Sequence, residues 1–246
     1  MRTARQSDQE QADRNDRPAS RLQESANDLG VAPISLPQDA SQTRPGSATP
    51  CHNSNMLFLA SASPRRRELL AQAGFSFQVH PAHIPEDPNP NEDPIAYVIR
   101  LAREKAQAVF SQLSANPETA LNLAVLGADT TVALDNRILG KPEDPADAAR
   151  ILRLLSGRTH RVITGVALVT AEATEVAAEA TGVRFLTLSD EEIAAYVATG
   201  EPMDKAGAYA IQGRAARWIP RIEGDYFNVV GLPIALVSTL IEASRF

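Results

Sequence analysis

The residues with the clearest chemical meaning lie at the start of one expected helix. Ser63 and Pro64 follow a short apolar run, and Arg65, Arg66 and Arg67 come directly after them. A serine N-cap and a proline at the first helical position begin a helix well. Cations are unfavourable at the positive end of a helix dipole, so three arginines there suggest an anion that offsets them. The pattern indicates a phosphate or polyphosphate site, with a solvated basic helix start as the alternative.

Two further places combine a charged side chain with turn-forming neighbours. Asp129 and Thr130 come just after the apolar run 123–128, which reads as a buried strand. A carboxylate at the carboxyl edge of an α/β sheet lies where ligands gather, and would hold a divalent cation or orient a water. A turn aspartate that accepts backbone N–H groups is the alternative. Lys141 follows Gly140 and offers a point charge for phosphate, a weak signal by itself.

The segment 200–213 gathers charged side chains among small residues. It contains Asp204 and Lys205, and Gln212 stands between an isoleucine and a glycine. A glutamine amide both donates and accepts hydrogen bonds, which suits reading the edge of a base. Glu86 adds a carboxylate in the proline-rich loop 81–93. Lys105 lies on a long expected helix, where a solvated helix face is the alternative to a functional role.

Strand-like and helix-like segments must position these residues, and they alternate from residue 56 onward. Strands are expected at 56–61, 75–80 and 123–128, a hairpin over 131–139 with its turn at Asp135-Asn136, and long strand-like runs at 158–171 and 175–188. Helices are expected at 64–73, 94–113, 145–155, 190–198 and 231–244. This order predicts an α/β domain with a mixed sheet.

Composition narrows the class of protein. The chain has 246 residues and a formal net charge of −6, which argues against a protein that coats nucleic acid. A single cysteine, Cys51, forms no internal disulfide and fits a reducing cytosol. No run is long and apolar enough to span a membrane, and the N-terminus lacks the apolar segment of a secretory signal.

Residues 1–55 differ from the rest of the chain. They are rich in polar residues and proline, and show no sustained apolar period. Such a segment buries too little apolar surface to offset its conformational entropy, so we expect a disordered extension. The alternative is that Met56 is the true first residue. Residues 56–246 then form the folded domain.

Several short motifs of this domain follow one another in a fixed order. They are Leu59-Ala60-Ser61-Ala62-Ser63-Pro64-Arg65-Arg66, Leu101-Ala102-Arg103-Glu104-Lys105-Ala106, Gly127-Ala128-Asp129-Thr130, Leu139-Gly140-Lys141-Pro142, Leu155-Ser156-Gly157, Glu201-Pro202-Met203-Asp204-Lys205-Ala206-Gly207 and Gly231-Leu232-Pro233. Each is weak alone, but the ordered series is specific. It resembles the Maf family of nucleoside triphosphate pyrophosphatases.

The resemblance implies a fold, a reaction and partners. The fold is α/β, a mixed twisted sheet flanked by helices, with two lobes around a cleft as in inosine triphosphatases. The reaction is hydrolysis of a nucleoside triphosphate to the monophosphate and diphosphate, with a divalent cation, Mg²⁺ or Mn²⁺. A cytoplasmic location and a homodimer are further implications, and neither nucleic acid nor a membrane is an expected partner.

The resemblance also implies catalytic roles by motif position. Asp129 matches the acceptor that activates water, and Glu86 matches its partner acid, so that both would hold the metal. Lys105 and Lys141 match positions that face the phosphates. The family usually has an acid immediately before the glutamate aligned with Glu86, whereas this chain has Pro85. The metal site therefore has one carboxylate fewer, or the neighbouring aspartate replaces it.

Substrate recognition follows from the same comparison of motifs. Arg65, Thr130 and Gln212 match positions that set base preference, and the start of the helix, with Ser63 and Arg66, would hold the phosphates. The loop with Asp204 and Lys205 resembles the branch that acts on dTTP and UTP, because the branch acting on 7-methyl-GTP typically has a cysteine after the aspartate. Rival hypotheses are hydrolysis of 7-methyl-GTP or inosine triphosphate, and a non-enzymatic nucleotide sensor that inhibits septum formation.

Overall fold

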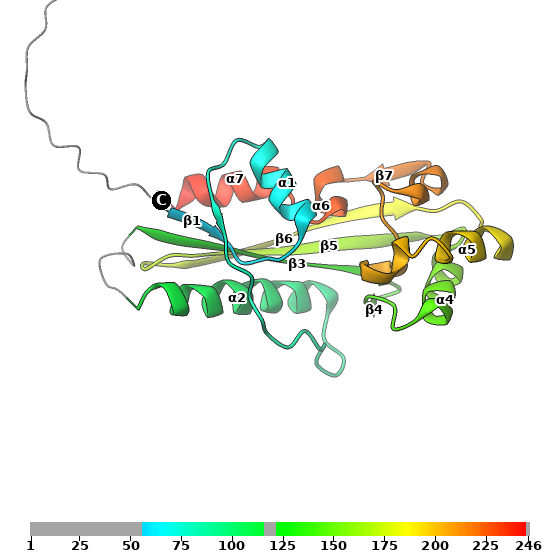
Figure 1. The fold of residues 1–246 in the computed structure, drawn as a ribbon, viewed down its shortest axis with the longest axis horizontal. Coiled ribbons are helices and arrows are strands. Elements are labelled where there is room, and N and C mark those ends of the chain that lie inside the picture. Colours follow the sequence, from blue (N-terminus) through cyan, green and yellow to red (C-terminus); the bar gives the residue numbers. More distant parts are fainter. Residues whose placement is uncertain (1–55, 116–121, 245–246) are drawn as a thin grey trace, which may run out of the picture. The chain divides into compact units, whose positions relative to one another are not determined.

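The fold is built on one mixed β-sheet, which a computed structural model describes within residues 56–115 and 122–244 (Figure 1). The expectations for residues 1–55 lie outside the described part of the chain. Within the described part, none of the helices combines the length and the apolar character needed to cross a bilayer.

Seven strands form the sheet. They are β1 (Met56–Leu59), β2 (Gln78–Val79), β3 (Leu123–Leu134), β4 (Arg137–Leu139), β5 (Thr159–Val169), β6 (Thr174–Arg184) and β7 (Arg221–Glu223). Their order is β2-β1-β3-β5-β6-β7, with β4 paired to the far end of β3. β1 is parallel to β2 and β3, and the other pairs are antiparallel. This is the mixed sheet that the sequence predicted.

Helices cover both faces of this sheet. The long helix α2 (Pro94–Leu113) lies on one face, and α1 (Pro64–Gln72), α6 (Tyr226–Val230) and α7 (Ile234–Ala243) lie on the other (Figure 1). At the end of the sheet near β4 are α4 (Pro145–Leu155), α5 (Asp190–Val197) and the 3-10 helices η1 (Glu201–Asp204), η2 (Ala206–Ala208) and η3 (Arg214–Trp218). The α/β class with flanking helices is confirmed.

Local sequence explains where most of these helices begin. Asp93 accepts hydrogen bonds from two backbone N–H groups of α2, and Asp144 accepts one from α4. Ser189 begins α5 with a capping box to Glu192. These side chains satisfy donors that the first helical turn leaves free. Pro64 begins α1 as expected, but the Ser63 side chain makes no capping hydrogen bond, so that detail of the prediction is wrong.

Apolar residues pack in groups at both ends of the sheet. One group, which includes Ile151, Phe185 and Trp218, joins α4, α5 and η3 to the sheet. Others join α1 and α7 to one face and α2 to the opposite face, with Leu70 and Val109 fully buried. The two ends therefore have separate cores on a shared sheet, and this leaves room for a cleft between them.

Three sequence-based boundaries are corrected by the structure. The expected strand 75–80 is reduced to Gln78–Val79, because its only partner, β1, is itself four residues long. The strand expected to end before Asp129 continues to Leu134, because β5 pairs with it as far as Ala133 and β4 pairs with Leu134. The expected helix 231–244 begins later, at Ile234, and the short helix α6, which the sequence did not predict, precedes it.

Candidate active site

The cleft opens where strand β3 lacks a neighbour on one side. β1 ends at Leu59, and β4 begins to pair with β3 only at Val132. Between these points, residues 127–131 pair with β5 alone in the described part of the chain. Successive side chains of a strand point to opposite faces, so Asp129 faces α2 and Thr130 faces α1 and α6. The sequence indicated that Asp129 lies at the carboxyl end of a strand. In the structure, that strand end is the end of β1, and Asp129 lies beside it within β3.

Lys105 bridges two carboxylates on the α2 side of this opening. Its Nζ lies 2.7 Å from Asp129 Oδ1 and 2.5 Å from Glu86 Oε1. Lys105 and Asp129 are each only 6% exposed, so Lys105 does not lie on a solvated helix face. Close approach of α2 depends on Gly127, because a Cβ there would lie 2.1 Å from the Ala102 carbonyl oxygen. A buried ammonium needs such partners, and two carboxylates supply them.

Glu86 reaches Lys105 from a loop that α2 anchors. The Tyr97 hydroxyl donates to the Glu86 carbonyl at 2.8 Å. Arg100, one turn further along, pairs with Glu92 at 2.7 Å and holds the pKa of that carboxyl at about 2. Burial alone would raise the pKa of Glu86, but the hydrogen bond and charge of Lys105 outweigh it and lower the pKa. Glu86 is thus held as a carboxylate at the mouth of the cleft.

Arg66 bonds to protein groups on the opposite face of β3. Its Nε donates to the Gly231 carbonyl at 2.8 Å, and its Nη1 donates to the Ala128 carbonyl at 2.8 Å and to Ser61 Oγ at 3.2 Å. Its Nη2 donates to Thr130 Oγ1 at 2.9 Å. Burial lowers the pKa of this guanidinium, although the carboxylates of the cleft oppose the shift. Arg66 therefore supplies hydrogen-bond donors to the edge of β3 that lies beyond the end of β1. Few of its donors remain for a phosphate.

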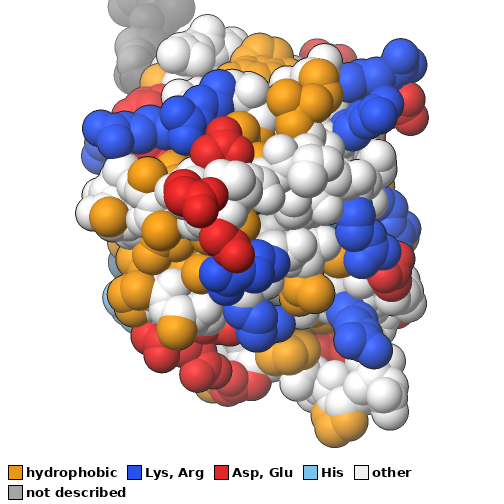
Figure 2. Space-filling view, turned by 90° about the vertical axis from the view of Figure 1, so that its right-hand side faces the viewer, with side chains coloured by type: hydrophobic (Ala, Val, Ile, Leu, Met, Phe, Trp, Pro, Cys, Tyr) orange, Lys and Arg blue, Asp and Glu red, His pale blue; other side chains and the backbone are white. Residues whose placement is uncertain are grey.

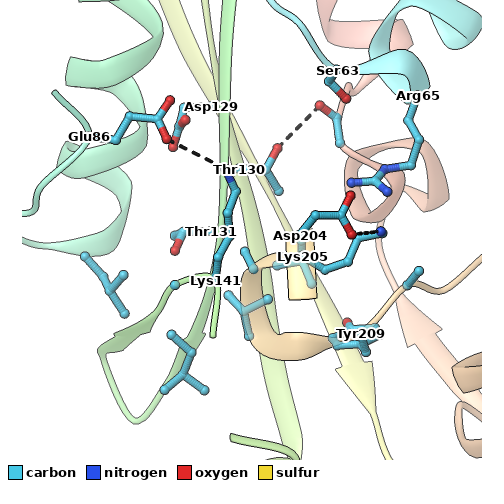
Figure 3. A pocket seen from close by; sticks show the side chains of 18 of the residues that line it. Ser63, Arg65, Glu86, Asp129, Thr130, Thr131, Lys141, Asp204, Lys205 and Tyr209 are labelled. Atoms are coloured by element: carbon cyan, nitrogen blue, oxygen red, sulfur yellow. Dashed lines mark hydrogen bonds and ion pairs between the residues drawn. The ribbon is translucent and has the colours of Figure 1, made fainter. Parts of the chain in front are cut away.

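The other cationic side chains lie around the space above these groups (Figure 3). Lys141 extends from the loop after β4, with its Nζ 3.9 Å from Glu86 Oε2. Arg65 comes from α1 and points toward Asp204, which forms an ion pair with the adjacent Lys205. Lys141 has 63% of its side chain exposed, in contrast to the buried Lys105. Exposed cations facing a hollow are available to a ligand, whereas buried and paired ones hold the structure.

All of the sequence-predicted site residues line one cleft of about 870 Å³. They are Ser63, Arg65, Arg66, Glu86, Lys105, Asp129, Thr130, Lys141, Asp204, Lys205 and Gln212. Pockets that bind small molecules usually measure about 300–1,000 Å³, so a nucleotide is of a suitable size. The structure thus brings together residues from five separate motifs, while their individual roles stay predictions.

Positive and negative side chains are mixed on the face of the molecule that forms the right-hand side of Figure 1. Figure 2 shows this face with Lys and Arg side chains interspersed among Asp and Glu, and they do not form one basic patch. The expectation that nucleic acid is not a partner stays a prediction.

Several side chains that line the cleft were not predicted from the sequence, among them Tyr97, Thr131 and Tyr209. Tyr97 gave one usable signal, because it lies eight residues before Lys105 and so shares its helix face. The sequence around Tyr209 gave no such signal. Its hydroxyl contacts His160 Nε2 at 2.8 Å, and His160 lies 49 residues away in the chain.

The carboxylates fit a hard divalent cation that also binds the substrate. Among the described residues, no group of three or more Asp, Glu, His or Cys side chains would hold a metal by itself. Mg²⁺, however, usually keeps several waters and takes one or two carboxylates together with substrate phosphates. Asp129 and Glu86 provide that pair. Asp87, next to Pro85-Glu86, also lines the cleft, as the replacement for the missing acid would.

Comparison with known proteins gives the family of this chain. A family model described as Maf-like protein matches residues 56–244, so the chain belongs to the Maf family. A dTTP/UTP pyrophosphatase from Koribacter versatilis is 56% identical over 186 residues, which cover 76% of this chain and 93% of that protein. A protein of the same name from Moorella thermoacetica is 53% identical, and the match covers 75% of this chain and 93% of that protein. Another from Bacillus pumilus is 48% identical, and the match covers 76% of this chain and 96% of that protein.

Proposed function

We propose that this protein is a nucleoside triphosphate pyrophosphatase that hydrolyses dTTP and UTP to the monophosphate and diphosphate. The observation that carries the proposal is the pair of carboxylates held by one buried lysine, beside exposed cations, in a cleft of nucleotide size. The names of relatives at about half identity or more support the same substrates.

In the proposed reaction, water attacks the α-phosphorus and the bond to the β-phosphate oxygen breaks. Asp129 accepts the proton of that water through Oδ2, because Oδ1 is held by Lys105. Diphosphate leaves as its negative charge develops, and Lys141 stabilises that charge. Lys105 holds the two carboxylates in position.

A divalent cation, Mg²⁺ or Mn²⁺, would be held by Asp129 and Glu86 and would supply charge neutralisation for the phosphates. Gln212 would contact the pyrimidine, and Arg65 and Thr130 would help to set the preference for a base. The expected cytoplasmic location and homodimer stay predictions, as does any role in septum formation.

The proposal is tested with a panel of nucleotides and a measurement of the phosphate product. The panel contains dTTP, UTP, dCTP, ATP, GTP, 7-methyl-GTP and inosine triphosphate, each with Mg²⁺ or Mn²⁺. We expect the highest kcat/KM with dTTP and UTP and release of diphosphate, for the full chain and for a chain that begins at Met56. Release of orthophosphate, or a preference for 7-methyl-GTP or inosine triphosphate, would contradict the proposal. Tight binding without turnover would favour the sensor.

The role of Asp129 is tested by Asp129→Asn, which keeps an oxygen that accepts from Lys105. Loss of a positioned base costs about 100-fold or more in rate, so we expect kcat to fall by at least that factor while far-UV circular dichroism shows the fold intact. Asp190→Asn is the control, because Asp190 lies on α5 with 72% of its side chain exposed. Full turnover by Asp129→Asn would remove Asp129 from the proposed mechanism.

A further inference from the structure

Gln212 lies in a tight turn that is held at both ends. The turn covers residues 210–214, between η2 and η3, and is closed by a hydrogen bond from the Gly213 N–H to the Ala210 carbonyl at 3.0 Å. At its start, the Ala210 N–H donates to the Tyr196 hydroxyl at 3.3 Å. At its end, the Arg214 N–H donates to both carboxylate oxygens of Glu201, at 3.0 and 3.3 Å.

Tyr196 and Glu201 are themselves joined. The Tyr196 hydroxyl donates to Glu201 Oε1 at 2.8 Å, so one phenol and one carboxylate connect both ends of the turn. Tyr196 is only 2% exposed and packs edge-on against Trp218, with ring centroids 5.0 Å apart. Burial, together with the hydrogen bond to Glu201, raises the pKa of Tyr196, so its proton stays in place to donate.

Gly213 is the third part of this arrangement. A Cβ at this position would lie 2.0 Å from Glu201 Oε1, so the carboxylate packs directly against the glycine. Neither Tyr196 nor Glu201 lines the cleft, whereas Ala210 and Gln212 between their contacts do. Both side chains therefore act on the cleft only through the backbone of the turn.

We propose that Tyr196 and Glu201 are positioning residues for base preference, which clamp the turn of Gln212 so that its amide meets thymine or uracil in one orientation. The inference rests on the proposed function. Thymine and uracil present an N–H donor at N3 and a carbonyl at C4, whereas cytosine presents an acceptor at N3 and an amino group. A glutamine amide on a loose turn can meet either pattern. Discrimination therefore requires a turn that keeps its position.

The test compares the binding of dTTP and dCTP by calorimetry in the full chain carrying Asp129→Asn, so that binding is measured without turnover. Tyr196→Phe keeps the ring and removes the hydroxyl. Because the hydroxyl's hydrogen bonds to Glu201 Oε1 and from the Ala210 N–H are both lost, we expect the dTTP-to-dCTP affinity ratio to fall by roughly tenfold, with dCTP affinity little changed. Tyr226→Phe is the matched control, because Tyr226 is 40% exposed on α6.

Two more variants separate positioning from folding. Glu201→Gln keeps an oxygen for the Arg214 N–H and should keep the affinity ratio within about threefold of the original. Gly213→Ala leaves both clamping side chains present but displaces the carboxylate, and should lower the ratio as Tyr196→Phe does. Thermal unfolding of each variant shows whether it is folded at the assay temperature.

An unchanged ratio in folded Tyr196→Phe and Gly213→Ala would overturn the inference. Equal loss of dTTP and dCTP affinity would also overturn it, since it would indicate a purely structural role. Failure of the proposed function would give a different result. The chain without substitutions at Tyr196 or Gly213 would then show no preference for dTTP over dCTP, and no preference would be left for the clamp to set. A preference for dTTP that survives both substitutions removes the clamp alone.

Discussion

The charged residues of this cleft are of two kinds. Some are bonded to other protein groups and stabilise the fold, and others are exposed to the cleft. Lys105 is buried between Asp129 and Glu86, and Arg66 donates to groups of three chain segments. Lys141 is largely exposed at the mouth. Burying a charge is costly unless it is paired, so Lys105 and Arg66 give most of their donors to protein acceptors. Their substitution should affect stability as well as activity.

Arg66→Lys tests this distinction. A lysine ammonium has three donors at one point and cannot reach the four separate acceptors that a guanidinium fork reaches. Because hydrogen bonds to charged groups contribute about 1.5–3 kcal/mol each, we expect the free energy of unfolding to fall by about 2–3 kcal/mol. Urea unfolding measures this change. Arg67→Lys is the matched control, since Arg67 is exposed on the same helix and should change stability by under about 0.5 kcal/mol. Equal effects of the two substitutions would contradict the assignment.

At the scale of elements, the site depends on how closely α2 lies on the sheet. α2 carries Lys105 and β3 carries Asp129, and their contact requires the helix backbone to approach the strand backbone. Gly127 permits this on β3, and Gly165 permits it on β5, where a Cβ would lie 2.4 Å from the Val98 carbonyl oxygen. Glycine is needed here for the space around its Cα.

Gly127→Ala should therefore separate α2 from β3. Overpacking against backbone typically costs about 1–3 kcal/mol, and we expect the upper end of that range in the free energy of unfolding, with a fall in kcat as Lys105 moves from Asp129. Gly140→Ala is the control for stability, because a Cβ there meets nothing within 4 Å. Unfolding curves that coincide for Gly127→Ala and the original chain would show that the helix can shift at little cost.

At the scale of the whole molecule, one buried histidine links global stability to pH. His160 on β5 is 2% exposed and packs against the rings of Phe185 and Tyr209, with centroids 5.1 and 5.4 Å away. Among the described residues its Nδ1 has no hydrogen-bond partner. Burial lowers the pKa of His160 to about 4. In the folded protein this ring therefore stays neutral over a pH range in which an exposed histidine ring takes up a proton.

The expected pH dependence follows from that difference. Between the pKa of about 6.5 in the unfolded chain and about 4 in the folded one, only the unfolded state binds the proton. The free energy of unfolding should therefore fall as pH decreases through this interval, by up to about 3 kcal/mol, and this effect should end below pH 4. Urea unfolding from pH 7.5 to 4 measures the slope.

His160→Gln should reduce that slope, and His83→Gln, at an exposed position, should preserve it. An NMR titration of His160 provides an independent check. A titration of this ring near pH 6.5 would contradict the prediction.

Local patterns predicted most of the elements well, whereas the chemistry assigned to single residues stays a prediction. The helix over Pro94–Leu113 and the hairpin turn at Asp135-Asn136 are confirmed, because caps and turn residues act within a few positions. The place of Asp129 was predicted wrongly, as the end of a strand. Pairing with β5 extends that strand, and such pairing depends on distant residues: the partner of Asp129 is Gly165, 36 positions further along the chain.

The sequence by itself determined the α/β class, the family resemblance and the set of residue types that now line one cleft. The tertiary structure alone decided which charges are buried and what they contact: Arg66 meets Gly231 across 165 positions, and Lys105 meets Asp129 across 24. It also revealed the link from Tyr196 through Glu201 to the turn of Gln212. The physical reason is that motifs report local backbone preference, whereas burial and pairing arise only when distant segments pack together.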